Sequence, residues 1–177
     1  MKFATQETLR ARPTGRSEAV ILFTVAHQTF VIAAESVQEI RSTDSLAGTA
    51  IELKDSELPK VRHMVERAHR TYFVVNAGLH FGLPVTRPTL VLILRQLRAA
   101  ILVDHIERMA EISTVHALPR AFSGQERQWY RGLAYLDDRV MPVIRPTGFL
   151  TREEFGQLDQ LAKVAAAQHE LEGTLQS

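Results

Sequence analysis

Residues 119–150 read PRAFSGQERQWYRGLAYLDDRVMPVIRPTGFL, and this stretch decides how the rest of the chain is interpreted. Two short apolar runs flank the polar residues 137–139, a pattern typical of a β-hairpin. The stretch also contains Trp129, the single tryptophan of the chain. We therefore predict a loop or short helix that leads into a hairpin whose apolar side chains are buried.

The composition is that of one globular domain. The chain has 177 residues, of which 45% are apolar and 23% charged. Its formal net charge of +1 gives no general reason to expect binding to nucleic acid or to an anionic membrane. The absence of cysteine excludes disulfides and cysteine-ligated zinc. Apolar runs near the N-terminus are too short to span a bilayer, so we expect a cytoplasmic protein without direct membrane insertion.

Two further hairpins are predicted on either side of the middle of the chain. Residues 19–34 alternate in the β period and turn near His27, and residues 90–106 form two apolar runs separated by 95–98. Several short strands at close spacing favour an all-β barrel or sandwich.

Other segments follow the helical period. In 35–41, Val37 and Ile40 are spaced as in a single helical turn, and 56–70 carries apolar residues at helical spacing after a possible Ser56 cap. The closing segment 151–177 begins with Thr151 and Glu154, which form the T-x-x-E capping box. We predict an amphipathic helix there that packs on the β body and frays beyond His169, and a mobile arm over 1–17.

No catalytic, metal or cofactor motif is present. His63, His69 and His80 match no ligand spacing, so we expect packing or surface roles. Asp104 and His105 are neighbours on a strand, and their side chains should point to opposite faces. A hydrolase that uses this pair is therefore the least favoured alternative, and we expect no enzyme activity.

The absence of visible chemistry points to binding. Gln38-Glu39 and residues 129–131 are candidate exposed contacts, because Trp, Tyr and Arg are enriched at interface hot spots. The alternative for Trp129 is that it closes a hydrophobic lobe, leaving Arg131 nearer the surface. A nucleic-acid-binding barrel is the second alternative function, although the near-neutral charge disfavours it.

Three segments in order resemble the CheW-like domain, the family of chemotaxis coupling proteins. Val20 to Ile40 is similar to the opening of the family, with V-x-E-I as residues 37–40. Residues 99–106 are similar to its G-L-L-V-D-x-V strand, and 119–150 to its closing segment, with Gly132-Leu133.

The middle departs from the family pattern. Residues 66–69, Glu-Arg-Ala-His, stand where the family has N-L-R-G, and Asn76 replaces an aspartate. Because His69 tolerates a positive φ poorly, we expect a different backbone at this turn.

The resemblance implies a fold and a set of partners. It implies two intertwined five-stranded β-barrel lobes over 18–150, SH3-like in shape, followed by a C-terminal α-helix. It also implies a non-enzymatic adaptor without cofactors, which couples the cytoplasmic hairpin tip of a chemoreceptor to the regulatory domain of a CheA-type histidine kinase. The partner-binding positions carried over are Val37 and Glu39. Because the Arg-Gly pair of the family is absent, Arg67 and Arg70 are added as candidates to supply its charge.

Overall fold

The computed structural model describes residues 16–175, so most of the predicted N-terminal arm, residues 1–15, lies outside the described chain. The strands in this part are β1 (Glu18–Val25), β2 (Gln28–Ala33), β3 (Val37–Ser42), β4 (Ile51–Glu52), β5 (Val61–Arg67), β6 (Arg70–Asn76), β7 (Leu90–Leu94), β8 (Ala99–Val103), β9 (His105–Ile112), β10 (Tyr130–Leu136) and β11 (Arg139–Ile144). The α-helices are α1 (Ala77–Phe81), α2 (Glu126–Trp129) and α3 (Arg152–Leu175), and the 3-10 helices are η1 (Ala34–Ser36), η2 (Thr43–Leu46) and η3 (Pro146–Gly148).

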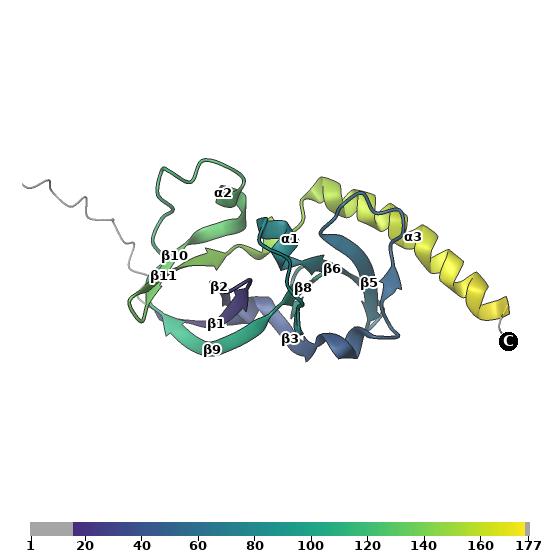
Figure 1. The fold of residues 1–177 in the computed structure, drawn as a ribbon, viewed down its shortest axis with the longest axis horizontal. Coiled ribbons are helices and arrows are strands. Elements are labelled where there is room, and N and C mark those ends of the chain that lie inside the picture. Colours follow the sequence, from purple (N-terminus) through teal and green to yellow (C-terminus); the bar gives the residue numbers. More distant parts are fainter. Residues whose placement is uncertain (1–15, 176–177) are drawn as a thin grey trace, which may run out of the picture.

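The strands of the described residues form two sheets. The first has the order β10-β11-β2-β1-β9, and the second has the order β3-β7-β8-β6-β5-β4. The chain begins in the first sheet, builds the whole second sheet and then returns to finish the first (Figure 1). The two lobes are therefore intertwined, as expected from the sequence.

A shared hydrophobic core joins the lobes. Phe23 and Phe30 from the first sheet pack in one cluster with Phe73 and Leu92 from the second, and Leu158 of α3 belongs to the same cluster. Each lobe also has a smaller cluster of its own. Strands such as β1 and β8 are thus buried on both faces, which explains why their sequences read as nearly continuous apolar runs.

The three predicted hairpins are confirmed, and several turns between strands have positive φ at residues other than glycine. β1–β2, β7–β8 and β10–β11 pair antiparallel. Ala26 and His27 have φ of 48° and 64°, and the β5–β6 turn has φ of 49° at Ala68 and 60° at His69. Non-glycine residues at positive φ cost about 1–2 kcal/mol each. The expectation that His69 would force a different backbone is wrong, because the turn adopts positive φ without glycine.

Two segments with helical spacing are strands. Residues 56–70 contain β5 instead of a helix, and 35–41 contain only the end of η1 before β3. Both strands have a register shift, between Val61 and His63 in β5 and between Val37 and Glu39 in β3. A bulge inserts one extra residue and shifts the inward positions from a spacing of two to a spacing of three. In β5 this extra residue places Val61 and Met64 in the core at a spacing of three. In β3 the pattern has another cause, since Ile40 is exposed and only Val37 faces the core.

The lobes differ in detail from the expected pair of five-stranded barrels. The second sheet has six strands among the described residues, and the strand ladders of residues 16–175 do not close either sheet completely. At the open side of the first sheet, His116 and Leu133 exchange two backbone hydrogen bonds of 2.8 Å. Gly132 permits this approach, because a Cβ there would lie 2.3 Å from the carbonyl oxygen of His116.

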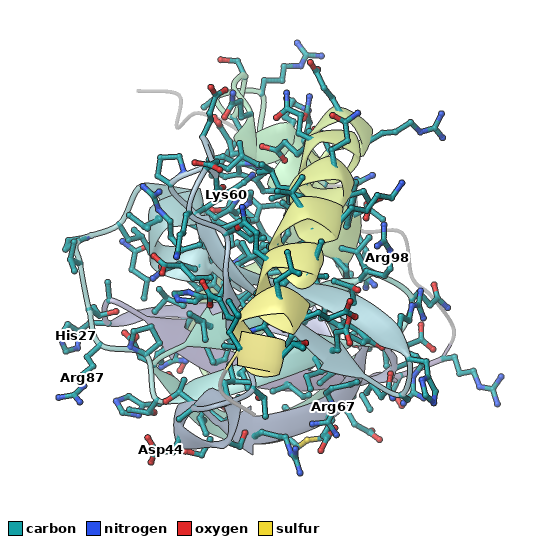
Figure 2. All side chains as sticks on the ribbon, turned by 90° about the vertical axis from the view of Figure 1, so that its right-hand side faces the viewer. His27, Asp44, Lys60, Arg67, Arg87 and Arg98 are labelled. Carbon is teal, nitrogen blue, oxygen red and sulfur yellow. The ribbon has the colours of Figure 1, made fainter. Side chains whose placement is uncertain are left out.

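The C-terminal helix is held against the second sheet from two sides. Its capping box forms as predicted, since the Glu154 N–H donates to Thr151 Oγ1 and the Thr151 N–H donates to the Glu154 carboxylate. Lys60 and Arg98 lie on opposite sides of the helix (Figure 2) and pair with Glu154 and Asp159 respectively. The helix continues to Leu175, beyond the predicted end near His169.

Candidate partner-binding surface

The first carried-over positions lie on β3, an edge strand of the second sheet. Val37 is only 7% exposed and packs in the shared core, so its side chain fixes the strand instead of facing solvent. Glu39 follows the bulge and is half-buried, and Ile40 is exposed. One side of β3 has no strand neighbour among the described residues, which leaves this edge open.

The structure brings Glu39 and Arg67 together. One carboxylate oxygen of Glu39 lies 2.8 Å from Arg67 Nη2, and the other lies 2.8 Å from Arg41 Nε. Arg67 is the last residue of β5, so the contact joins strands that are not neighbours in the sheet. The side chains of Glu39 and Arg67 stay 32% and 33% exposed. The result is a small charged cluster on the surface, which we call the Glu39 cluster.

A depression borders the Glu39 cluster. It has a volume of about 290 Å³, and Arg41 and Arg67 line it together with Leu46 from η2 and Val65 from β5. Arg70 begins the next strand and directs its guanidinium over the ring of Tyr72, at 5.8 Å from the ring centroid. Of the four predicted positions, Glu39 and Arg67 therefore meet in one cluster. Arg70 lies opposite Arg67 at the β5–β6 turn, and the Val37 side chain at the start of β3 is buried.

A groove opens between elements of the two lobes. Its volume is about 610 Å³. Its lining combines η1, the β7–β8 turn and the segment that follows β11, with Leu97 and Pro146 as apolar walls and Arg95 and Arg145 as cations. Arg95 Nε donates to the carbonyl oxygen of Glu35 at 3.0 Å, which fixes the turn against η1. The sequence does not reveal these arginines as a pair, because they are fifty residues apart in the chain.

Asp104 and His105 do not form a catalytic pair. Asp104 is buried and accepts hydrogen bonds from the Ala26 N–H and from Thr86 Oγ1, both at 2.7 Å, while His105 is exposed. The carboxylate therefore holds the β1–β2 turn and the segment before β7. This arrangement contradicts the hydrolase alternative.

A buried aromatic cluster fills the space around Trp129. The Trp129 ring lies 4.8 Å from His80 and 5.8 Å from Phe81, centroid to centroid, and Phe149 also contacts His80. Burial, together with the nearby charge of Lys60, lowers the pKa of His80 to about 3. Trp129 is half-buried, which agrees with its predicted role in closing a lobe. Arg131 is exposed and pairs with Glu18.

Carboxylates offset part of the arginine charge on the surface. Six of the described arginines lie in ion pairs with carboxylates, which offset the charge that a nucleic-acid backbone requires. These arginines are Arg41, Arg67, Arg98, Arg108, Arg131 and Arg139. Within residues 16–175, no three His, Asp or Glu side chains gather in a way that could hold a metal ion. None of the helices in this part is long and apolar enough to cross a membrane.

Residues 19–154 match the family model described as the CheW-like domain. Among solved structures, the chain is similar to the scaffolding protein TtCheW from Thermoanaerobacter tengcongensis, with a TM-score of 0.65 and 14% sequence identity. That similarity covers 77% of this chain and 95% of the other. No protein with a curated description matches this chain. Most of α3 lies beyond the matched residues.

Proposed function

Because the chain belongs to the CheW-like domain family, we propose that it is a non-enzymatic scaffold of a bacterial chemosensory pathway, acting in the cytoplasm. In this role it couples the cytoplasmic hairpin tip of a chemoreceptor to the regulatory domain of a CheA-type histidine kinase. The similarity to a protein described as a scaffold supports this proposal.

The single observation that carries the proposal is the Glu39 cluster. Glu39 belongs to the segment that resembles the V-x-E-I of the family, and Arg67 is a candidate for the charge of the missing family arginine. The two side chains meet at 2.8 Å, with Glu39 on an open sheet edge. Charged side chains that remain partly exposed at an edge strand suit a polar contact that sets specificity and association rate. We assign the kinase regulatory domain to this surface, with Glu39, Arg67 and Arg70 as contacts and Val37 as the support beneath them.

The groove between the lobes suits the receptor tip. Its apolar walls match the anchors that an amphipathic helix presents at helical spacing, and Arg95 and Arg145 provide partners for acidic side chains at its rim. Each contact is modest in area, so we expect individual affinities in the micromolar range that increase when many copies are arrayed.

Calorimetry with the cognate kinase regulatory domain and with a receptor-tip peptide tests the proposal. Arg67→Glu should weaken kinase binding about tenfold or more, and the exchanged pair Glu39→Arg with Arg67→Glu should recover part of it. Arg145→Glu should instead weaken peptide binding. The matched control is Arg139→Glu, which breaks an exposed ion pair with Glu107 on the first sheet. Absence of binding to either partner at about 100 μM would remove the proposed function.

A further inference from the structure

The second half of α3 projects from the body of the protein (Figure 1). The helix packs through Leu158 and Ala162, which are buried, but every residue from Ala167 to Leu175 is exposed. Isolated helices of this length are marginal in water unless a packed face supports them. The projecting half therefore presents a regular surface that the rest of the described chain leaves uncovered.

A groove runs along one side of this helix. It has a volume of about 410 Å³ and lies between α3 and the loop 55–58. Leu58, Leu161 and Val164 form its apolar walls. The other side of the helix is different, because Asp159 there pairs with Arg98 and lies near the charge of Lys163. The groove and the Arg98 side are thus chemically distinct faces.

An apolar stripe extends the groove toward the end of the helix. Val164, Leu171 and Leu175 are 53%, 66% and 87% exposed. Together with Leu161 they follow the alternating spacing of three and four residues that a helix presents to a partner helix. Gln168 occupies the remaining position of the stripe. Exposed apolar residues aligned on one helix face, here interrupted once by Gln168, are typical of an interaction surface.

The border of this surface is acidic. Asp55 and Glu57 stand exposed on the loop side of the groove, and Glu172 lies on the helix one turn beyond Gln168. In the described part of the chain, none of these three carboxylates takes part in an ion pair, in contrast to the paired Asp159 on the opposite face. Two exposed cations stand near the loop but do not line the groove: Lys54 precedes it, and Arg62 Nη1 donates to the carbonyl oxygen of Ser56 at 3.3 Å.

The charge pattern decides which occupant fits. Two copies of this chain that paired through the stripe would bring like carboxylates together, which disfavours self-association. A helix with an apolar face and lysine or arginine flanks would bury the stripe and neutralise the border. We propose that this surface, formed by loop 55–58 and by α3 from Leu161 to Leu175, docks a cationic amphipathic helix of another protein. The site lies largely outside the matched residues 19–154 and is independent of the two surfaces assigned above.

Fluorescence anisotropy with the full chain and a labelled amphipathic peptide of leucine and lysine tests the proposal. We expect saturable binding with a dissociation constant of about 10–100 μM that weakens as salt is raised. Val164→Asp and the pair Asp55→Lys with Glu57→Lys should each weaken it by about tenfold or more. The matched control is Val140→Asp, which places the same charge at an exposed valine of β11 on the first sheet. Circular dichroism confirms that each variant is folded.

Three outcomes would overturn the proposal. They are equal binding by all variants, equal binding of a leucine and glutamate peptide of the same pattern, and no binding at about 200 μM. Sedimentation of the chain alone tests whether it self-associates. A dimer that is abolished by Val164→Asp would assign the surface to a second copy and overturn the proposal. Titration of the same variants with the kinase domain and the receptor-tip peptide should show unchanged affinities, which separates this site from the proposed function.

Discussion

The carboxylate of Glu39, on the edge strand β3, lies 2.8 Å from the guanidinium of Arg67 at the end of β5. The two strands are not paired, so the contact bridges the open side of the second sheet. An exposed pair of this kind contributes about 0–1 kcal/mol to stability. Its geometry therefore serves mainly to hold two charges together on the surface.

We expect Arg67→Gln to change stability little. The free energy of unfolding, measured by urea denaturation, should fall by less than about 1 kcal/mol, because solvent replaces the partly exposed ion pair. The affinity of the Arg67→Gln variant for the kinase regulatory domain should fall. A loss of more than about 2 kcal/mol in stability would show instead that the pair supports the fold.

Gly132→Ala should strongly destabilise the protein. The added Cβ would meet the carbonyl oxygen of His116 at 2.3 Å, and this oxygen belongs to backbone that cannot move aside without breaking the bridge to Leu133. A cost of about 1–3 kcal/mol or more is expected for such overpacking.

Gly156→Ala provides the matched control. This glycine lies within α3, and a Cβ there meets nothing within 4 Å. Alanine is favoured over glycine in a helix by about 1 kcal/mol, so thermal denaturation should show a higher Tm. Equal destabilisation by both substitutions would contradict the role assigned to Gly132.

Stability should fall as the pH drops below 6.5. His80 is 8% exposed and its pKa is lowered to about 3 in the folded state, so the unfolded chain binds a proton at higher pH than the folded chain. The neutral folded form is therefore favoured above pH 6.5, and this stabilisation declines as the pH falls from 6.5 toward 3. Its full size is at most about 5 kcal/mol.

His80→Phe isolates this contribution. Phenylalanine keeps an aromatic ring against Trp129 and Phe149 but does not titrate. The variant should lose most of the slope of unfolding free energy between pH 6.5 and 5, measured by denaturant titration at each pH. Carboxylates whose pKa is lowered, such as Glu18 and Asp159, change the stability only at pH values below 5. An unchanged slope between pH 6.5 and 5 would contradict the prediction.

Arg98→Lys should loosen α3. Arg98 donates two hydrogen bonds of 2.8 Å to Asp159, and its guanidinium also lies 5.6 Å from the rings of Phe73 and Phe155. Lysine keeps the charge but neither the planar fork nor the stacking. We expect a loss of about 1 kcal/mol, since the pair is partly exposed. Arg139→Lys, at a more exposed pair, should change stability by less than about 0.5 kcal/mol.

Features that depend on neighbouring residues were predictable. The hairpin of 119–150 and the capping box of Thr151 and Glu154 are both present, because turn chemistry and capping act over a few residues. Asn76, which stands where the family has an aspartate, caps α1 by accepting the Leu79 N–H at 3.0 Å.

Bulged strands were not predictable by periodicity. In β5 the extra residue near Arg62 places Val61 and Met64 in the same core at a spacing of three. Whether a strand carries a bulge depends on its partner strand, which the local sequence does not specify. In β3 the spacing of Val37 and Ile40 was misleading for another reason, because Ile40 is exposed and does not share the buried face of Val37.

The family, the hairpins and the closing helix could be inferred from the amino-acid sequence, because they follow from short-range patterns and from an ordered set of motifs. The burial of Val37, the contact between Glu39 and Arg67, and the acidic groove beside α3 became visible in the folded structure. Each of these facts depends on how segments distant in the chain pack against one another. Burial and charge pairing belong to that packing, and no single segment encodes them.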